Sequence, residues 1–385
     1  MARSLKIAFY SDSFLPAVDG VVISMLNFRK ELMRRGHEVH IYASGNAATE
    51  RLKHRYSNLH VIRGLSFKRY PQYSIAFLPG AAAIRNIGID FDVAHLQTPF
   101  TVGVQGMIVA KVNKTPTVGT FHTMFTNSAV VKEYTSNNKM VREFIKRYSW
   151  VYLKHFYGRC DSVLAPSEVI GGMLDKKGIH NVGVVPNSVD ISRFNPRADG
   201  TRIRAELNIT DAEHMVLFAG RVSREKNLEV MINAARMLKN DGFRFVIAGT
   251  GPGYEHYTKM VMRAGLGDVF DFVGFVDNAN LPEYYAAADA FCMPSTFETQ
   301  GIVTLEAMAC GLPVVGADYL ALKDLIVNGV NGEKFPAGDY KACARKIRKV
   351  INNIESYKGM WDTAKQYSLQ KTTDRLLDAY KNIIH

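Results

Sequence analysis

Short apolar runs alternate with helical patterns along this chain. Residues 6–10 form an apolar run typical of a buried strand, and an amphipathic pattern begins at about Val21. The pattern should end at Arg34-Arg35-Gly36, because basic residues in the last turn followed by glycine are helix-stop signals. Residues 39–43 form the next apolar run. A strand, a helix and a strand at this spacing predict a βαβ unit, and therefore a parallel sheet with right-handed crossovers.

The same unit recurs in both halves of the chain. In the first half, apolar runs that end in polar or proline-containing loops occupy residues 92–96, 116–122 and 162–166. In the second half, comparable runs occupy residues 215–221, 245–251, 270–274, 290–293 and 313–317. The predicted fold class is therefore α/β, with two Rossmann-like halves. Ligands of such sheets bind beyond the carboxyl ends of the strands, so we expect the active site in a cleft between the two domains.

Composition agrees with two ordinary globular domains. A chain of 385 residues is too long for one comfortable core, and 47% apolar with 22% charged residues are globular values. No run of eighteen apolar residues occurs, and the start leads directly into a strand rather than a signal peptide, so we expect a cytoplasmic protein. The four cysteines contain no C-x-x-C pair, which favours reduced thiols over disulfides or zinc.

The positive charge is concentrated in the first half. Residues 1–190 hold 24 Lys and Arg against 13 Asp and Glu, a net +11, whereas residues 191–385 hold 24 against 23, a net +1. Within the first half, residues 132–159 combine seven basic residues with two Glu and many aromatic residues. Such a stretch suits an anionic membrane surface, where rings enter the headgroup layer and cations meet lipid charge. The alternative interpretations are a solvated basic helix face and nucleic-acid binding, although no nucleic-acid motif is present.

The most informative stretch follows the apolar run at residues 290–293. Residues 294–301 have the composition of a loop, so a helix can begin only near Ile302. Backbone N–H groups from Thr299 through Gln300 and Gly301 to Ile302 would then face the ligand side, where a helix start attracts anionic or hydroxyl-rich groups. Glu298 in the loop and Glu306 in the helix would brace two parts of one extended ligand.

This pattern resembles the E-x7-E signature of retaining glycosyltransferases with the two-domain GT-B fold, of the type called group 1 or GT4, and in particular lipid hexosyltransferases. The resemblance implies that Glu298 holds hydroxyls of the donor sugar and that Glu306 holds the ribose of the nucleotide. It also assigns the donor diphosphate to Arg221 and Lys226, which match a G-R-x-x-x-x-K pattern. Two cations at a helix start can neutralise a departing diphosphate without a metal.

Further positions match the family less sharply. Asp19-Gly20 resembles a glycine-containing loop where backbone approaches the donor, and His122 resembles an active-site histidine that contacts the donor sugar or the acceptor. The remaining donor-side expectations are a tight turn next to the donor at Gly249 and Gly251, and backbone contact with the nucleobase at Phe275 and Val276. The catalytic set implied by the resemblance is His122, Arg221, Lys226 and Glu298.

The resemblance also implies a domain layout. Residues 1–187 would form an acceptor-binding domain, onto which a C-terminal helix at about 364–385 packs back, and residues 188–363 would bind the nucleotide sugar. No metal and no cofactor other than the donor substrate are expected. Asp90-Phe91-Asp92 imitates a D-x-D metal motif, but it precedes a strand, and we interpret it as a solvated turn.

The leading hypothesis is a metal-independent, retaining hexosyltransferase that moves a sugar from UDP or GDP to a membrane-associated acceptor, with a glycerolipid favoured. Such an enzyme would be peripheral on the inner face of the cell membrane. The same chemistry on a soluble sugar or glycerol derivative is the runner-up. A sugar-nucleotide epimerase on the same fold and a basic nucleic-acid-binding protein are the remaining alternatives.

Overall fold

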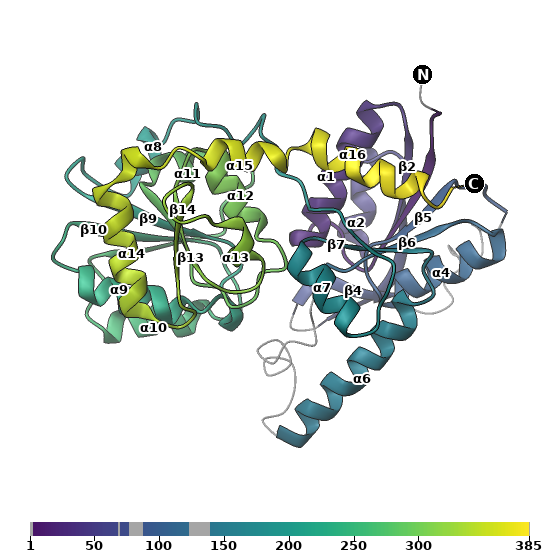
Figure 1. Ribbon diagram of the computed structural model, residues 1–385, viewed down its shortest axis with the longest axis horizontal. Coiled ribbons are helices and arrows are strands. Elements are labelled where there is room, and N and C mark those ends of the chain that lie inside the picture. Colours follow the sequence, from purple (N-terminus) through teal and green to yellow (C-terminus); the bar gives the residue numbers. More distant parts are fainter. Residues whose placement is uncertain (1–2, 68–69, 77–87, 123–138, 385) are drawn as a thin grey trace. The chain divides into compact units, whose positions relative to one another are not determined.

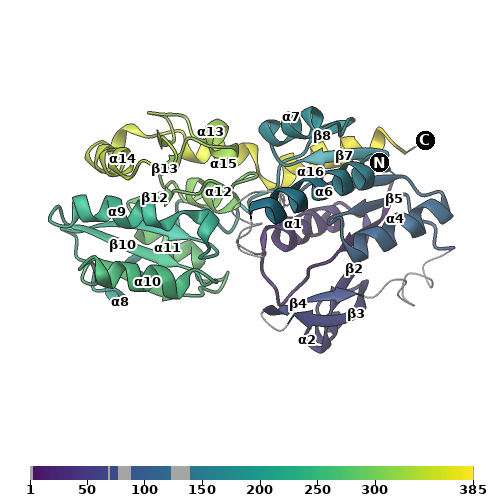
Figure 2. The same cartoon turned by 90° about the horizontal axis from the view of Figure 1, so that it is seen from below.

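The computed structural model describes residues 3–67, 70–76, 88–122 and 139–384, which form two domains with parallel sheets (Figures 1 and 2). The N-terminal domain comprises Met1–Ser188 together with Leu369–His385, and the C-terminal domain comprises Val189–Ser368. The chain thus passes between the domains twice, after Ser188 and after Ser368. Both domains show the alternation of strands and helices that the sequence predicts.

The N-terminal domain is built on one eight-stranded sheet. Its strand order is β4-β3-β2-β1-β5-β6-β7-β8, and every neighbouring pair is parallel except the antiparallel pair of β3 and β4. The strands are β1 (Lys6–Ser11), β2 (Glu38–Gly45), β3 (Leu59–Phe67), β4 (Tyr70–Ala76), β5 (Val93–Leu96), β6 (Thr117–Thr120), β7 (Ser162–Ala165) and β8 (Val182–Val184). The central strands β1, β2, β5, β6 and β7 match the predicted apolar runs, and the β3–β4 pair is an addition to them.

Helices connect and cover this sheet. They are α1 (Gly20–Arg34), α2 (Ala47–Glu50), α4 (Thr101–Asn113), α6 (Lys139–Tyr157), α7 (Glu168–Lys176) and the C-terminal α16 (Leu369–Lys381). Helix α16 belongs to this domain: Leu376 and Tyr380 are in its core, and the Tyr380 hydroxyl is 2.7 Å from Nδ1 of His95. An ion pair between Arg35 and Asp374 fixes it further to the end of α1.

Helix α6 extends beyond the rest of the N-terminal domain at its beginning, as Figure 1 shows. Its last turns are anchored, because Leu153, Phe156 and Tyr157 are buried and the Tyr152 hydroxyl donates a hydrogen bond to the carbonyl of Pro99. The helix accounts for the basic, aromatic stretch predicted at residues 132–159, of which residues 132–138 lie outside the described residues.

The C-terminal domain has a six-stranded sheet, parallel throughout, in the order β11-β10-β9-β12-β13-β14. The strands are β9 (His214–Ala219), β10 (Phe243–Ala248), β11 (Phe270–Gly274), β12 (Ala290–Met293), β13 (Val314–Ala317) and β14 (Gly332–Phe335). The helices are α8 (Thr201–Glu206), α9 (Leu228–Leu238), α10 (Tyr254–Arg263), α11 (Leu281–Ala287), α12 (Ile302–Ala309), α13 (Ala321–Leu325), α14 (Tyr340–Asn352) and α15 (Met360–Gln366). One continuous apolar core fills the domain.

Three details differ from the sequence expectations. The returning helix starts at Leu369 instead of about 364, because residues 360–366 form the separate helix α15 and Ser368 pairs with Val189 as a β-bridge. The β6 strand ends at Thr120, so His122 lies two residues beyond its end. Asp92 is not a solvated turn residue: its carboxylate accepts a hydrogen bond of 2.7 Å from the backbone N–H of Lys6 and thereby joins β5 to β1.

The four cysteines are free thiols, and two of them, Cys292 and Cys343, are buried with their sulfurs 3.9 Å apart. No helix among the described residues has the length and apolar character needed to cross a membrane.

Candidate active site

The predicted donor residues follow four neighbouring strands of the C-terminal sheet. The strands β11, β10, β9 and β12 are adjacent and parallel, so the loops after them emerge at the same, carboxyl edge of the sheet. Phe275 and Val276 follow β11, and Phe275 is 61% exposed. The other predicted residues are distributed among the next three loops: Gly249 and Gly251 after β10, Arg221 and Lys226 after β9, and Glu298 to Gly301 after β12.

Backbone hydrogen bonds join the first three of these loops. The Gly220 N–H donates to the Ala248 carbonyl at 2.9 Å, and the Gly249 N–H donates to the Gly274 carbonyl at 2.7 Å. Gly249 has φ of +152°, and a Cβ at this position would lie 1.8 Å from the Gly220 carbonyl oxygen. Glycine is therefore required at Gly249 by close backbone approach, which brings the arginine-bearing loop against the glycine turn.

An ion pair joins the loop after β9 to the loop after β12. Lys226 ends a short 3₁₀ helix (Arg224–Lys226), and its Nζ lies 2.5 Å from Oε1 of Glu298. Both side chains are largely shielded, with exposed fractions of 17% and 9%. The Thr296 N–H also donates to the carbonyl of Glu225, at 3.2 Å. Arg221, in the same loop as Lys226, is exposed.

Helix α12 begins where the sequence predicted, at Ile302. The residue before it, Gly301, has φ of +86°, a left-handed conformation that favours glycine. The first bonds to the Gly301 carbonyl come from the N–H groups of Thr304 and Leu305, so the N–H groups of Ile302 and Val303 precede them in the first turn. Thr299 and Gln300 complete this turn region, the former half-buried and the latter buried.

Glu306 lies on the second turn of α12 and is buried, with an exposed fraction of 8%. The Tyr285 hydroxyl, on α11, donates a hydrogen bond to Oε2 of Glu306 at 2.9 Å. Burial raises the pKa of Glu306 to about 7, and the Tyr285 hydrogen bond and the positive charge of Arg193 oppose that rise. The two predicted glutamates are thus held differently, Glu298 by a cation and Glu306 by a neutral hydroxyl.

The predicted residues of the N-terminal domain also lie at the carboxyl ends of strands. Asp19, after β1, caps α1: its carboxylate accepts a 2.9 Å hydrogen bond from the Val22 N–H, and the next residue, Gly20, is exposed in the first turn. His122 lies beyond β6, with its Nε2 2.8 Å from Oε1 of Gln97. An amide oxygen only accepts hydrogen bonds, so Nε2 of His122 carries the hydrogen. Burial lowers the pKa of His122 to about 4, which keeps the imidazole neutral at pH 7.

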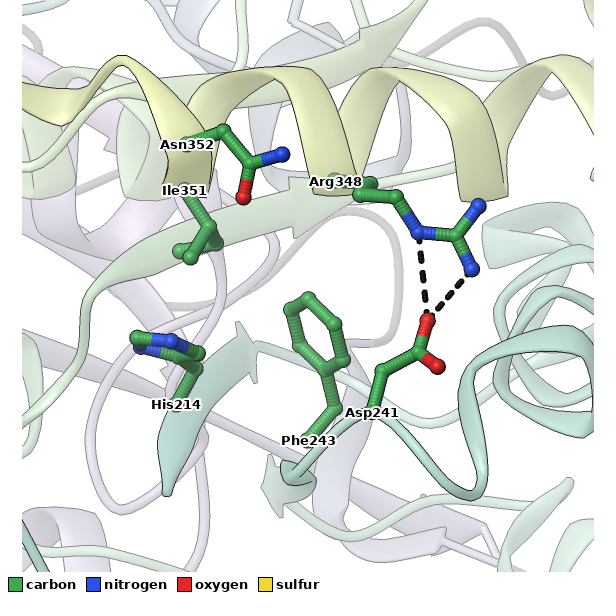
Figure 3. A pocket seen from close by; sticks show the side chains of 6 residues that line it. All are labelled: His214, Asp241, Phe243, Arg348, Ile351 and Asn352. Carbon is green, nitrogen blue, oxygen red and sulfur yellow. Dashed lines mark hydrogen bonds and ion pairs between the residues drawn. The ribbon is translucent and has the colours of Figure 1, made fainter. Parts of the chain in front are cut away.

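A pocket of about 370 Å³ in the C-terminal domain lies elsewhere (Figure 3). His214 and Phe243, which line it, are the first residues of β9 and β10, and Arg348 on α14 and Asp241, also in its lining, form an ion pair. The amino ends of the strands form the edge of the sheet opposite the loops described above. This pocket is therefore separate from the predicted donor residues.

Sequence reasoning missed the partners of two key side chains. Gln97 directly follows the predicted strand at residues 92–96, so its place at a strand end was a usable signal for a contact with His122. Tyr285 carried no such signal, because it is one of several aromatic and alanine residues in a short helix. Among the described residues, no group of three or more His, Cys, Asp or Glu side chains is arranged to hold a metal ion.

Comparison with known proteins identifies related sequences for both domains. Residues 18–193 match the family model described as Glycosyltransferase Family 4, and residues 199–367 match Glycosyl transferases group 1. A GDP-mannose-dependent alpha-mannosyltransferase of Mycolicibacterium smegmatis is 30% identical over 84% of this chain and 82% of its own length. An alpha-monoglucosyldiacylglycerol synthase of Streptococcus pneumoniae is 28% identical over 85% of this chain and 74% of its own length.

Solved structures share the fold over nearly the whole chain. Anabaena HepE in complex with UDP and glucose has a TM-score of 0.77 at 20% identity, covering 98% of this chain and 100% of that one. Sucrose-phosphate synthase of Thermosynechococcus elongatus has a TM-score of 0.78 at 19% identity, covering 99% of each chain. Together with the two family matches, these findings show that the chain belongs to the group 1, family 4 type of glycosyltransferases and has their GT-B fold.

Proposed function

We propose that this glycosyltransferase moves a hexose, with retention of anomeric configuration, from a UDP- or GDP-linked donor to a glycerolipid at a membrane surface. The observation that carries the donor half of the proposal is the Lys226–Glu298 ion pair at the start of α12. It keeps a cation for a diphosphate and a carboxylate for sugar hydroxyls within 2.5 Å of each other, next to N–H groups that favour anions.

The charges suit departure of a nucleotide diphosphate. In the transfer, the bond between the sugar C1 and the diphosphate oxygen breaks, and a bond from C1 to an acceptor hydroxyl oxygen forms. The acceptor proton passes to the departing phosphate oxygen, so no protein base is needed. Lys226 and Arg221 would stabilise the negative charge that grows on the diphosphate, which is where preorganised cations act most strongly.

His122 fits a role in positioning and not in acid catalysis. Its low pKa leaves it neutral, and its Nε2–H is directed to Gln97. A neutral imidazole held in one tautomer can hydrogen-bond a sugar or acceptor hydroxyl without competing for the proton of the reaction.

The membrane half of the proposal rests on α6. Met140, Phe144, Tyr148 and Val151 recur at helical spacing and are 81%, 59%, 58% and 61% exposed; we call this set the apolar face of α6. The exposed basic residues Arg147 and Lys154 lie on the same helix. Large apolar side chains exposed in a row beside cations are typical of helices that lie in a membrane interface.

The names of several relatives agree with a lipid acceptor. Two are alpha-monoglucosyldiacylglycerol synthases and one is the sulfoquinovosyl transferase of Arabidopsis thaliana. Others are GDP-mannose-dependent alpha-mannosyltransferases, which is why both UDP and GDP remain in the proposal. The nucleotide-sugar partner is further supported by the UDP and glucose in the HepE structure.

The donor and the stereochemistry are tested in one assay. The protein is incubated with UDP-glucose, UDP-galactose, GDP-mannose and ADP-glucose, each with diacylglycerol in anionic vesicles or with soluble glycerol. We expect transfer from a UDP or GDP donor to the lipid, with an α-linked product from these α-linked UDP and GDP donors. A β-linked product would refute retention, and transfer only to glycerol would favour the soluble-acceptor alternative.

The membrane surface is tested by sedimentation with anionic vesicles. Binding should weaken as salt rises, because the Debye length falls from about 10 Å at 0.1 M to about 3 Å at 1 M. A double charge reversal of Arg147 and Lys154 should reduce binding strongly, and Phe144→Ser with Tyr148→Ser should remove the part that survives high salt. The matched control reverses Lys341 and Arg345, two exposed cations of α14. Equal losses in both charge variants would contradict a surface specific to α6.

A further inference from the structure

In the Glu306 carboxylate, Oε2 accepts a hydrogen bond from the protein and Oε1 is the second oxygen. The Tyr285 hydroxyl donates to Oε2 at 2.9 Å. Among the residues that the structure describes, Tyr285 is the side chain that hydrogen-bonds this carboxylate, and Arg193 acts on it through its charge. Glu306 as a residue is only 8% exposed, and a buried carboxylate ordinarily has more hydrogen-bond partners than this one has. The arrangement leaves Oε1 for a ligand.

Three titratable or charged groups face Glu306, each from a different segment. Tyr285 comes from α11, Arg193 from the segment before α8, and Cys310 from the end of α12. Burial raises the pKa of Cys310 to about 12 and that of Tyr285 well above its usual value, so both stay neutral. Arg193 is therefore the one group among the three that supplies a charge.

The side chains of Arg193 and Tyr285 are connected through Phe194. The Arg193 guanidinium lies 4.7 Å from the centre of the Phe194 ring, and that ring meets the Tyr285 ring edge-on at 5.8 Å. Nη2 of Arg193 is buried, and no hydrogen-bond partner for it exists within the described part of the chain. The guanidinium therefore packs on the Phe194 ring, and its positive charge lowers the pKa of Glu306.

We propose that Tyr285 and Arg193 are positioning residues for donor binding: they keep the Glu306 carboxylate ionised and turned so that Oε1 accepts hydrogen bonds from the ribose. This inference rests on the proposed function, because it takes Glu306 to be the ribose-binding residue. It adds two residues and a pH dependence that the pairing of Glu298 with Lys226 does not require.

The physical reason is the chemistry of the carboxyl group. An ionised carboxylate only accepts hydrogen bonds, whereas a protonated one carries a donor and loses acceptor capacity. Burial favours the protonated form, and the Tyr285 hydrogen bond and the Arg193 charge favour the ionised form. Donor affinity should therefore be full above the pKa of about 7 and fall by about tenfold for each pH unit below it.

The first test reads Glu306 in the free protein. Carbon NMR of labelled glutamate gives its titration midpoint, with Glu306→Gln identifying the signal. Tyr285→Phe and Arg193→Gln should each raise the midpoint. Tyr284→Phe, a change of the neighbouring residue on the same helix, should leave it unchanged, and Arg193→Lys should restore it by returning the charge. A midpoint that does not move in Tyr285→Phe or in Arg193→Gln would overturn the proposal.

The second test reads donor binding. UDP-glucose, UDP-galactose and GDP-mannose are titrated calorimetrically from about pH 5.5 to about pH 8.5, a range in which their diphosphate groups do not change charge. Affinity for the preferred donor should fall toward low pH, and binding near the midpoint should release a proton. The fall should begin at higher pH in Tyr285→Phe. A 2′,3′-dideoxyribose analogue should bind weakly and with a much flatter pH profile.

The two tests separate the possible failures. If UDP-glucose, UDP-galactose and GDP-mannose all fail to bind at any pH, the proposed function fails, and the ribose role of Glu306 fails with it, whatever the NMR midpoints. If a nucleotide sugar binds with the same affinity across the range, the proposed function stands and this inference is overturned. Arg193→Gln decides the question alone if Tyr285→Phe does not fold.

Discussion

Glu298 and Glu306 are eight residues apart in sequence, yet the protein holds them in opposite ways. Glu298 lies in a loop and is paired with a cation, Lys226, that lies in the loop after another strand, β9. Glu306 lies within a helix, is buried, and receives a single hydrogen bond from a neutral hydroxyl. In the first arrangement, the charges of Glu298 and Lys226 neutralise each other until a ligand binds to either side chain. In the second, the Glu306 carboxylate can still accept a hydrogen bond from a ligand. Similar residues near one helix start can thus serve different parts of one substrate.

The largest expected effect comes from removing the cations of the Glu298 region. Lys226→Ala and Arg221→Ala should each lower kcat by about 100-fold or more, because their charge acts mainly as the diphosphate departs. Arg224→Ala is the matched control, since Arg224 is an exposed cation of the same loop, and it should stay near the wild-type rate. Steady-state kinetics with the preferred donor provide the measurement. If kcat fell by a similar factor in all three variants, the total charge of the loop would matter, and the specific positions of Arg221 and Lys226 would not.

A smaller effect is expected on the stability of the Glu306 region. Because the folded-state pKa of Glu306 is raised to about 7 from 4.5, the free energy of unfolding contributed by this group is highest below about pH 4.5 and declines as pH rises through about 7. Glu306→Gln removes the charge and should stabilise the ligand-free protein at pH 8 by on the order of 1–3 kcal/mol. It should change little at pH 5.

Thermal unfolding without nucleotide at the two pH values checks this expectation. The matched control is Glu298→Gln, which breaks a shielded ion pair and should not stabilise the protein at either pH. Stabilisation by Glu298→Gln at pH 8 equal to that by Glu306→Gln would remove the contrast between the two environments.

The smallest expected effect is that of chelation. Transfer should proceed at an unchanged rate in EDTA if Arg221 and Lys226 alone balance the diphosphate charge. The measurement is the initial rate before and after dialysis against EDTA, then with added Mg²⁺ or Mn²⁺. A rate that vanishes on chelation and returns with either metal would show that the cations of the protein are insufficient.

Much of the framework was predictable, because it depends on local pattern. The strands that carry the site loops are short apolar runs, and Gly301 before Ile302 marked the start of α12 correctly. The family resemblance suggested both glutamates and the cation loop, and the family itself is confirmed. What these residues do in catalysis is still a prediction.

The remaining features depend on contacts between distant residues, which a single sequence does not reveal. The Lys226–Glu298 pair spans 72 positions in the sequence. The Tyr285–Glu306 hydrogen bond joins α11 to α12, the helices that precede and follow β12 in the sequence. The position of Gln97 against His122 depends on the pairing of β5 with β6. The start of α16 differs from the prediction for a related reason, since α15 ends only at Gln366 and the break before α16 contains the bridge of Ser368 to Val189.

The central claim is that the two glutamates serve different parts of a nucleotide sugar, and free nucleotide tests it most directly. Titration of UDP and GDP at pH 8 into the wild type, Glu298→Ala and Glu306→Ala compares the two, because these nucleotides contain the ribose but no sugar to transfer. We expect Glu306→Ala to weaken binding of the preferred nucleotide by about 1–3 kcal/mol, roughly 5- to 150-fold in Kd, and Glu298→Ala to leave it nearly unchanged while lowering turnover. Equal losses of nucleotide affinity in both variants would contradict the account.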